Sequence, residues 1–301
     1  HVVCRRQRQM CIRDSLVFMN QSGRVLRKKK LRRHQMLSYF SQLEPCIVVM
    51  EACGSCHYWC RELTKAGHEV KAIAPQYVVA YRKGNKHDYN DAEAIAEASQ
   101  REGMRFVPFK SQDQQDIQLM HRIRERMIAQ QTALSNQIRG LLSEYGIVYA
   151  RGVATLVKEL PLTLEEADNG LSMLARRQFQ GLLNDLRELR EHIKEMDKEL
   201  KAFSQSQPVC ECLMSMTGIG PLIATALYAG IGQGQAFNSG RHLAAWLGVV
   251  PKQHTTGDNP RLLGISKRGN TYLRTQIING ARAALRHIGD KTDKVLSLIH
   301  I

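Results

Sequence analysis

Three acidic residues in the first third of the chain have the types and spacing of a metal-binding catalytic site. Glu51 follows the apolar run 46–50, which predicts a buried strand, and Asp88 and Asp91 precede a helix-like stretch, 92–100. Residues three apart share one face of a helix, so a strand end and a helix start could bring these carboxylates together. Their oxygens suit Mg²⁺, and two such ions about 4 Å apart can hold the attacking and leaving oxygens of a phosphodiester. A solvated helix face shows the same spacing, so the triplet alone leaves both interpretations open.

The composition of the chain favours a polyanionic partner. Its 301 residues are 43% hydrophobic, enough for two domains with separate cores, and the formal net charge is +15. A charge of this size favours nucleic acid over small acidic metabolites, although a generic soluble basic protein also fits. No apolar run approaches the roughly 20 residues that span a bilayer, and the first residues lack the apolar core of a signal peptide. We therefore expect a cytoplasmic protein with no membrane contact.

Both ends of the chain are expected to be non-native. Residues 1–15 (HVVCRRQRQMCIRDS) have no hydrophobic period, and residues 295–301 end in the similarly abrupt string LSLIHI. Both strings resemble adaptor read-through in translated sequence assemblies, so they are left out of the fold prediction. Without the first fifteen residues, which include four arginines and one aspartate, the net charge is still +12.

Most of the eight cysteines are expected to be free thiols. Cys53, Cys56 and Cys60, together with His57, have a spacing that mimics a metal cluster, but the second half of a zinc site is missing. Thiols buried where a helix packs on a strand are the favoured interpretation. No disulfide framework is indicated, which fits a reducing compartment.

Residues 16–110 alternate between strand-like and helix-like segments, which predicts an α/β layer fold. The expected strands are 16–20, 24–31, 46–50 and 69–73, and the expected helices are 35–43 and 56–65, with a further helix opened by Pro75. The first two strands would form a hairpin. The basic run 24–33 could follow a phosphate backbone, or it could protect a sheet edge from aggregation.

Residues 111–207 have the heptad spacing of long packed helices. Methionines and leucines recur every seven residues from Met120 to Leu141, and a second series of alternating spacings runs from Leu182 to Phe203. This pattern predicts two long helices joined by a loop near Pro161, either as a helical hairpin or as a dimer arm. Leu186, Leu189, Ile193 and Leu200 are expected to pack against another helix.

Residues 208–294 form a third predicted unit with two candidate contacts to nucleic acid. The turn Gly218–Gly220 precedes the apolar run 222–229 and resembles a helix-hairpin-helix element, whose exposed N–H groups can hold a phosphate. A tight turn between packed helices explains it almost as well. Lys267, Arg268 and Arg274 could form a basic face that contacts the backbone of DNA, with a solvated basic loop as the alternative.

Six ordered segments resemble one family, the DEDD insertion-sequence transposases of the "IS one-ten" group and its "IS eleven-eleven" branch. They are MEACGSCHYW, GNKHDYNDAEAI, NQIRGLLSEYGI, MTGIGPLIATAL, FNSGRHLAAWLGVVPKQHTTG and GISKRGNTYLR. The resemblance implies an α/β RuvC-like (RNase H-like) nuclease domain, a coiled-coil helical linker and a mainly α C-terminal transposase domain. It also implies a magnesium-dependent recombinase of the bacterial nucleoid, a homo-oligomer that cuts donor and target DNA under a structured guide RNA.

The resemblance assigns the catalytic residues. The second, third and fourth acids of the family fall on Glu51, Asp88 and Asp91. The family also uses a C-terminal serine to hold one DNA end covalently; the matching position is Thr256, a more hindered hydroxyl, and Ser266 is the nearest serine.

Two departures from the family keep other functions open. The first strand of the family, which carries its first Asp, is expected to be lost to the leader, and Asp14 stands too close to the hairpin to replace that Asp. The chain also ends before the C-terminal helices usual in the family. The alternatives are a Holliday-junction-type nuclease, which needs only the acids and metal, and a catalytically impaired remnant that binds nucleic acid.

Overall fold

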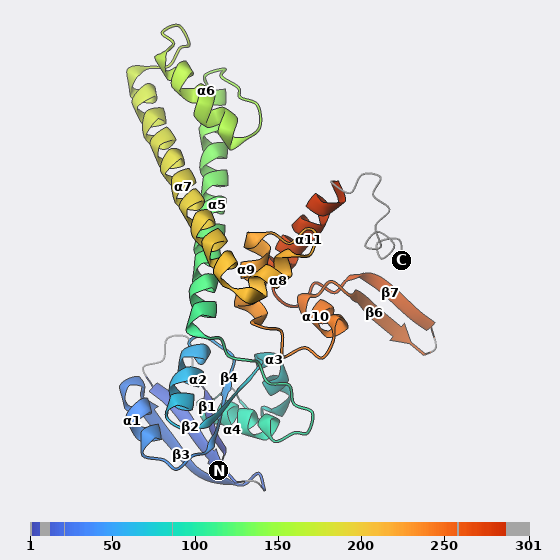
Figure 1. Ribbon diagram of the computed structural model, residues 1–301. Coiled ribbons are helices and arrows are strands. Elements are labelled where there is room, and N and C mark those ends of the chain that lie inside the picture. The colour runs from blue at the N-terminus through green and yellow to red at the C-terminus, as the bar shows by residue number, and fades with distance from the viewer. Residues whose placement is uncertain (1, 7–12, 21, 86, 258, 287–301) are drawn as a thin grey trace. The chain divides into compact units, whose positions relative to one another are not determined.

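The computed structural model describes residues 2–6, 13–20, 22–85, 87–257 and 259–286 (Figure 1). The chain divides into two compact units, His1–Gln112 and Asp113–Ile301, and each is described by itself. The tail 295–301 and residues 1 and 7–12 of the leader lie outside the described residues. Within the described part, no helix is both long and apolar enough to cross a membrane.

The first unit is built on a five-stranded sheet with the strand order β3-β2-β1-β4-β5. The strands are β1 (Val2–Arg6), β2 (Arg13–Met19), β3 (Val25–Arg32), β4 (Ile47–Glu51) and β5 (Glu69–Ile73). β1 pairs antiparallel with β2 and parallel with β4, so the sheet is mixed. The connecting helices are α1 (Met36–Ser41), α2 (Cys56–Lys65), α3 (Pro75–Val78) and α4 (Asp88–Ser99), with the short 3₁₀ turns η1 (Arg33–Gln35) and η2 (Val79–Tyr81).

The leader supplies the central strand of this sheet. We expected the sheet to lack its first strand, but β1 lies between β2 and β4 and pairs with both. The physical reason is that β2 and β4 would otherwise have unpaired backbone N–H and C=O groups along their facing edges, and an extended segment between them satisfies both edges. The non-native origin of the leader stays a prediction.

Helices cover both faces of the sheet. On one face, α1 and α2 pack on alternate strand residues in a core that includes Leu16, Phe40, Met50 and Trp59. On the other face, α4 packs on the intervening positions in a core that includes Met19, Val49, Ile73 and Ile95. This period-two alternation is what a strand buried on both sides requires. The mixed α/β first unit confirms the predicted fold class at this level, and the RuvC-like topology stays a proposal.

The thiols at the start of α2 lie in the first of these cores. Cys56 and Cys60 are buried with their Sγ atoms 3.7 Å apart, and Cys60 Sγ lies 3.8 Å from the sulfur of Met50. His57 Nδ1 accepts a hydrogen bond from the backbone N–H of Lys110 at 3.2 Å. The predicted packing of buried thiols between helix and strand is confirmed for Cys56 and Cys60, whereas Cys53 is half-buried and precedes α2.

The second unit begins with a long helical arm. α5 (Gln112–Ser143) and α7 (Met173–Ser206) run side by side with α6 (Val153–Glu165) between them in sequence (Figure 1). Leu186 and Leu200 are buried and Leu189 and Ile193 half-buried, so the heptad stripe packs within a single chain. The two long helices are thus confirmed. The expected loop at Pro161 is wrong, because Pro161 lies inside α6, where the apolar residues around it hold that helix against α7.

The base of the arm packs on a cluster of short helices. These are α8 (Pro208–Met214), α9 (Pro221–Ile231), α10 (Gly240–Leu247) and α11 (Thr271–Arg286), with the hairpin β6 (Pro251–Thr256) and β7 (Asn259–Ile265) after α10. Ile223, Leu227, Leu247 and Leu273 form their shared core. Ile117 of α5 and Leu200 of α7 meet Ala229 of α9, which joins the arm to this cluster. This part is mainly helical, as expected.

Candidate functional site

Asp88 and Asp91 lie in the first turn of α4, where the helix itself favours acidic residues. His87 caps the helix, because its Nδ1 accepts the backbone N–H of Tyr89 at 3.3 Å. The positive end of the helix dipole stabilises carboxylates in this turn. Asp88 is half-buried and Asp91 is 6% exposed, so both are on the side of α4 that turns toward the protein.

Glu51 projects from the sheet face that α4 covers. It is the last residue of β4, and Val49, two residues earlier, packs in the core beneath α4. Because side chains alternate along a strand, Glu51 belongs to the same face as Val49. Glu51 is half-buried and pairs with Ile73 of β5, which is also in that core.

The direction of α4 brings its acidic first turn to the end of β4 where Glu51 lies. The residue after the helix, Gln100, donates from Nε2 to the backbone oxygen of Asn20 at 2.9 Å. Asn20 follows β2, and Met19 pairs with Val2, which in turn pairs with Ile47 at the start of β4. The last turn of α4 therefore lies at the start of β4 and its first turn at the opposite end, over a helix length of about 18 Å.

The three predicted acids thus share one face and one end of the sheet. The guanidinium of Arg82 lies 3.8 Å from Asp91, so this carboxylate faces a cation of the protein itself. Within the described residues, no group of three His, Cys, Asp or Glu side chains is arranged so as to hold a metal ion. The donor set itself fits a hard divalent cation, since all three ligands would be carboxylate oxygens and Asp91 is nearly fully buried.

The predicted nucleophile, Thr256, lies at the tip of an exposed hairpin. It ends β6 and pairs with Asn259, and every residue of β6 and β7 is exposed. The backbone N–H of Ser266 donates to Val250 O at 2.8 Å, and its hydroxyl oxygen is buried with no hydrogen-bond partner among the described residues. Of the two hydroxyls that the sequence offered, the structure therefore presents Thr256 to solvent and covers Ser266.

The hairpin also exposes large apolar side chains. Leu262 is 67% exposed and Leu263 40%, on a two-stranded sheet with no core of its own. Isolated hairpins are marginally stable in water, so we expect a binding partner to stabilise this one.

The turn at Gly218 is a close-packed contact between helices. Gly218 has φ +89°, and a Cβ there would lie 2.9 Å from the backbone oxygen of Gly280 in α11. A side chain at Gly280 would in turn lie 2.3 Å from Gly218 O. Gly220 is exposed and open at the start of α9. Of the two interpretations of this turn, helix packing accounts for Gly218, and phosphate binding stays a prediction at Gly220.

Arg274 does not belong to a basic face, contrary to expectation. It is 7% exposed and donates to the backbone oxygens of Leu247 at 3.1 Å and Arg268 at 2.9 Å. The reason is that α10 ends at Leu247 with unpaired carbonyls, which a buried guanidinium can satisfy. Lys267 is exposed in the left-handed region at φ +54°, and Arg268 is exposed beside it. These two remain candidates for phosphate contact.

Sequence reasoning missed a buried polar network at the base of the arm. His121 of α5 is 3% exposed; its Nδ1 lies 2.8 Å from the hydroxyl of Tyr272 and its Nε2 3.0 Å from Thr225 Oγ1. Thr225 donates its own proton to Pro221 O at 2.8 Å, so it accepts from His121, and His121 accepts from Tyr272. A histidine one position from the apolar heptad residue Met120 was the available signal.

Burial sets the protonation of this network. Desolvation, with a smaller contribution from Arg124, lowers the pKa of His121 to about 4, partly opposed by Asp197. Burial likewise raises the pKa of Tyr272 to about 12. The imidazole is therefore neutral near pH 7 and ties α5 to α9 and α11.

We expect this histidine to make the second unit acid-sensitive. Its folded pKa of about 4 lies below the unfolded value of 6.5, so the unfolded state binds more protons between these pH values. The contribution of His121 to the free energy of unfolding should be fully present above pH 6.5. It should fall as the pH decreases toward 4, by up to about 3 kcal/mol. Thermal unfolding of the His121→Gln variant should show a flatter pH dependence than wild type over that window. Equal slopes would contradict the assignment.

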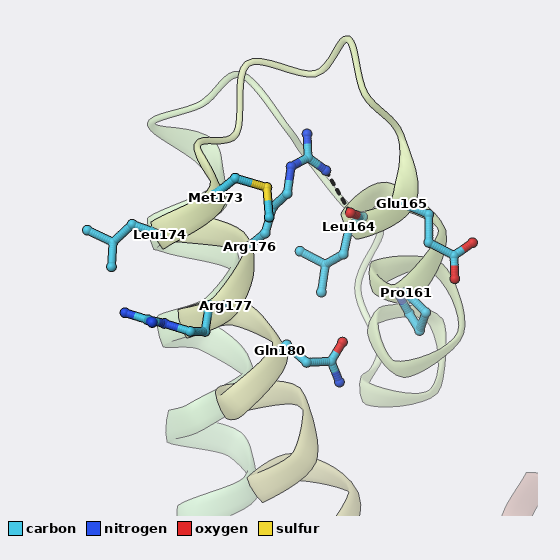
Figure 2. Close-up of a pocket in the computed structure, with 8 residues that line it drawn as sticks. All are labelled: Pro161, Leu164, Glu165, Met173, Leu174, Arg176, Arg177 and Gln180. Carbon is cyan, nitrogen blue, oxygen red and sulfur yellow. Dashed lines mark hydrogen bonds between the residues drawn. The ribbon is translucent and has the colours of Figure 1, made fainter.

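A cavity among the described residues lies at the tip of the arm. Figure 2 shows its lining, from α6 and the start of α7, around a volume of about 670 Å³. Arg176 donates to the carbonyl of Leu164 at 2.7 Å and so closes the end of α6, while Met173 is 82% exposed. Glu165 is the one acid in the lining, so this cavity holds no catalytic set.

Comparison with known proteins gives consistent matches along the chain. A DEDD transposase model matches residues 14–147, and a model described as the transposase IS116/IS110/IS902 family matches residues 210–296. The chain is 45% identical over 270 residues to a probable family 20 transposase of Pseudomonas aeruginosa, covering 89% of the chain and 80% of the relative. It is 44% identical over 279 residues to the transposase for insertion sequence element IS1111A of Coxiella burnetii, covering 93% and 77%.

Proposed function

The chain belongs to the IS116/IS110/IS902 family of insertion-sequence transposases, and on that basis we propose that it cuts and rejoins DNA under the guidance of a structured RNA. The observation that carries the proposal is the placement of Glu51 and the Asp88–Asp91 turn on one face and at one end of the same sheet. A phosphodiester bound there would lie against three carboxylates.

Each proposed residue has a distinct role. Glu51, Asp88 and Asp91 would hold the divalent metal on which the DEDD family depends, with Mg²⁺ proposed. When bound, such an ion neutralises charge on the phosphate that is cut. Arg82 would release Asp91 to the ion, since the two now form a partly exposed ion pair.

Thr256 is proposed to attack the phosphorus. A bond forms between its Oγ and phosphorus, and one bond between phosphorus and a deoxyribose oxygen breaks. The threonine proton passes to a carboxylate or to water, and the released sugar oxygen leaves as a hydroxyl after gaining a proton. The result is a DNA end held covalently until a second hydroxyl displaces the threonine.

The partners follow from charge and from exposed surface. The +15 chain and its exposed basic residues support binding of donor DNA, target DNA and a guide RNA in the nucleoid of the bacterial cytoplasm. The exposed apolar arm tip, with Met173 82% and Leu174 61% exposed, supports assembly into a homo-oligomer.

Two observations keep the catalytically impaired remnant as a second candidate. None of the five residues of β1 (VVCRR) is acidic, so the first acid of the family has no counterpart on this strand. Asp14 itself is buried and pairs with Leu31, which lies in the core of the opposite face from α4.

Strand cutting with and without metal separates these candidates. The chain is incubated with DNA that carries the ends of its own element and with the RNA transcribed beside it. We expect cut DNA in Mg²⁺ and a loss of about a thousandfold in EDTA, as several kcal/mol of charge stabilisation disappear. Cutting without the RNA would refute guidance and favour a metal-dependent nuclease of the Holliday-junction type. No cutting in any divalent metal, with DNA still bound, would establish the impaired remnant.

A further inference from the structure

The basic strand β3 forms one edge of the sheet and carries cations on both faces. It pairs only with β2 among the described strands, and its residues from Arg27 to Lys30 are all basic. On the face of α1 and α2, Lys29 lies 3.9 Å from the ring centroid of Tyr39. Arg27 lies over Phe18 on the same face at 6.0 Å. These two cations are therefore packed on aromatic rings.

Lys28 lies on the opposite face of the sheet, and its side chain contacts the first turns of α4. Its Nζ is ion-paired with Glu93 and lies 5.7 Å from the ring centroid of Tyr89, in the first turn of α4. Lys30 and Arg32 follow at two-residue intervals, so they project from the same face as Lys28 and lie beyond the start of that helix. Both are exposed, and in the described part of the chain neither has a carboxylate within ion-pair distance.

The strand register puts Lys30 and Glu51 in the same row, meaning that they are linked by paired positions across β2 and β1. Arg5 of β1 pairs with both Leu16 and Met50, so Ser15 and Glu51 occupy the next row toward the same end. Ser15 pairs with Lys30. Three strand spacings separate Lys30 from Glu51, a distance of about 14 Å. At a rise of 3.4 Å per nucleotide, this spans about four nucleotides of a DNA strand.

We propose that Lys30 and Arg32 bind the phosphates that flank the cut phosphodiester and position the DNA strand across the carboxylates. The inference rests on the proposed function, in which Glu51, Asp88 and Asp91 form the cutting site. Lys30 lies on the same face and in the same row as Glu51, and Arg32 lies on that face two residues further along β3. A DNA strand that reaches Glu51 would meet both cations, which favours the cut DNA over the guide RNA as the occupant. Lys30 and Arg32 are thus positioning residues for DNA.

The binding test compares two double variants of the whole chain. Lys30→Ala/Arg32→Ala removes the proposed contacts, and Lys65→Ala/Arg101→Ala removes the same charge from α2 and from just beyond the far end of α4, where these side chains are 71% and 61% exposed. Fluorescence anisotropy with a 30-base-pair DNA of mixed sequence, in EDTA, gives affinity over a salt series. The first variant should lower the slope of log affinity against log salt by about 2, since each duplex phosphate contact contributes about 0.9. The control should keep the wild-type slope.

The positional test uses DNA carrying the element's ends, ethylated at single phosphates. Cutting by wild type should be blocked by ethylation at one or two phosphates within about four nucleotides of the cut, and the Lys30/Arg32 variant should lose that sensitivity. Equal slopes for both variants, or loss of binding to an RNA of the same sequence with DNA binding intact, would overturn the inference. If wild type cuts no DNA in any divalent metal but the slope still falls, the cutting function fails while the phosphate-binding surface stands.

Discussion

Replacing Glu51 by glutamine should abolish DNA cutting while the chain stays folded and bound to DNA. The amide keeps the size of the side chain but removes the negative charge that would hold a metal ion. Losing one such charge-stabilising group costs about 10²–10³ in rate, and more where the ion itself is lost. The rate of strand cutting, measured in single turnover with Mg²⁺, is the direct readout. Asp88→Asn should behave in the same way, because it lies in the proposed ligand set.

A matched control separates chemistry from stability. Glu69→Gln changes the same atoms on β5, where Glu69 is exposed and paired with Lys71. Glu69→Gln should cut DNA at the wild-type rate. The Glu51→Gln, Asp88→Asn and Glu69→Gln variants should all unfold at temperatures similar to that of wild type. Wild-type cutting by Glu51→Gln would refute the carboxylate site. Loss of cutting in the Glu69→Gln control would show that the assay reports folding or charge and not catalysis.

Replacing Thr256 by alanine should eliminate the covalent protein–DNA adduct. The hydroxyl is the group that would bond to phosphorus, and its exposed position at the end of β6 means that truncation costs little stability. Thr256→Ser should retain the adduct or increase it, because serine lacks the β-methyl that hinders attack. Labelled DNA that migrates with the denatured protein measures the adduct.

Two neighbouring hydroxyls serve as controls for this assignment. Thr255 accepts a hydrogen bond from Gln253 Nε2 at 2.8 Å, and Thr255→Ala should leave adduct formation intact. Ser266→Ala should also leave it intact, because that hydroxyl is buried. An adduct that persists in Thr256→Ala and disappears in Ser266→Ala would show that Ser266, and not Thr256, is the nucleophile. An adduct unaffected by either change would refute the covalent mechanism for this chain.

The sequence by itself determined the features that depend on local patterns. Helix 56–65 and strand 69–73 were predicted with the bounds that the structure gives, because periodicity and the stop at Gly67 are encoded within a few residues. The heptads determined the two long helices of the arm in the same way. The acidic first turn of α4 and the candidate Glu51 also followed from residue type and position along the chain.

Only the tertiary structure decided what depends on partners far apart in sequence. The place of β1 between β2 and β4, the contact of Gly218 with Gly280 and the network of His121 each join residues that no local pattern relates. Arg274 was predicted to be exposed because a basic residue in a polar segment usually is, but a helix end with unpaired carbonyls outweighs that preference. Likewise, the row shared by Lys30 and Glu51 exists only once strands are paired, since register is set by packing between strands and not by either strand alone.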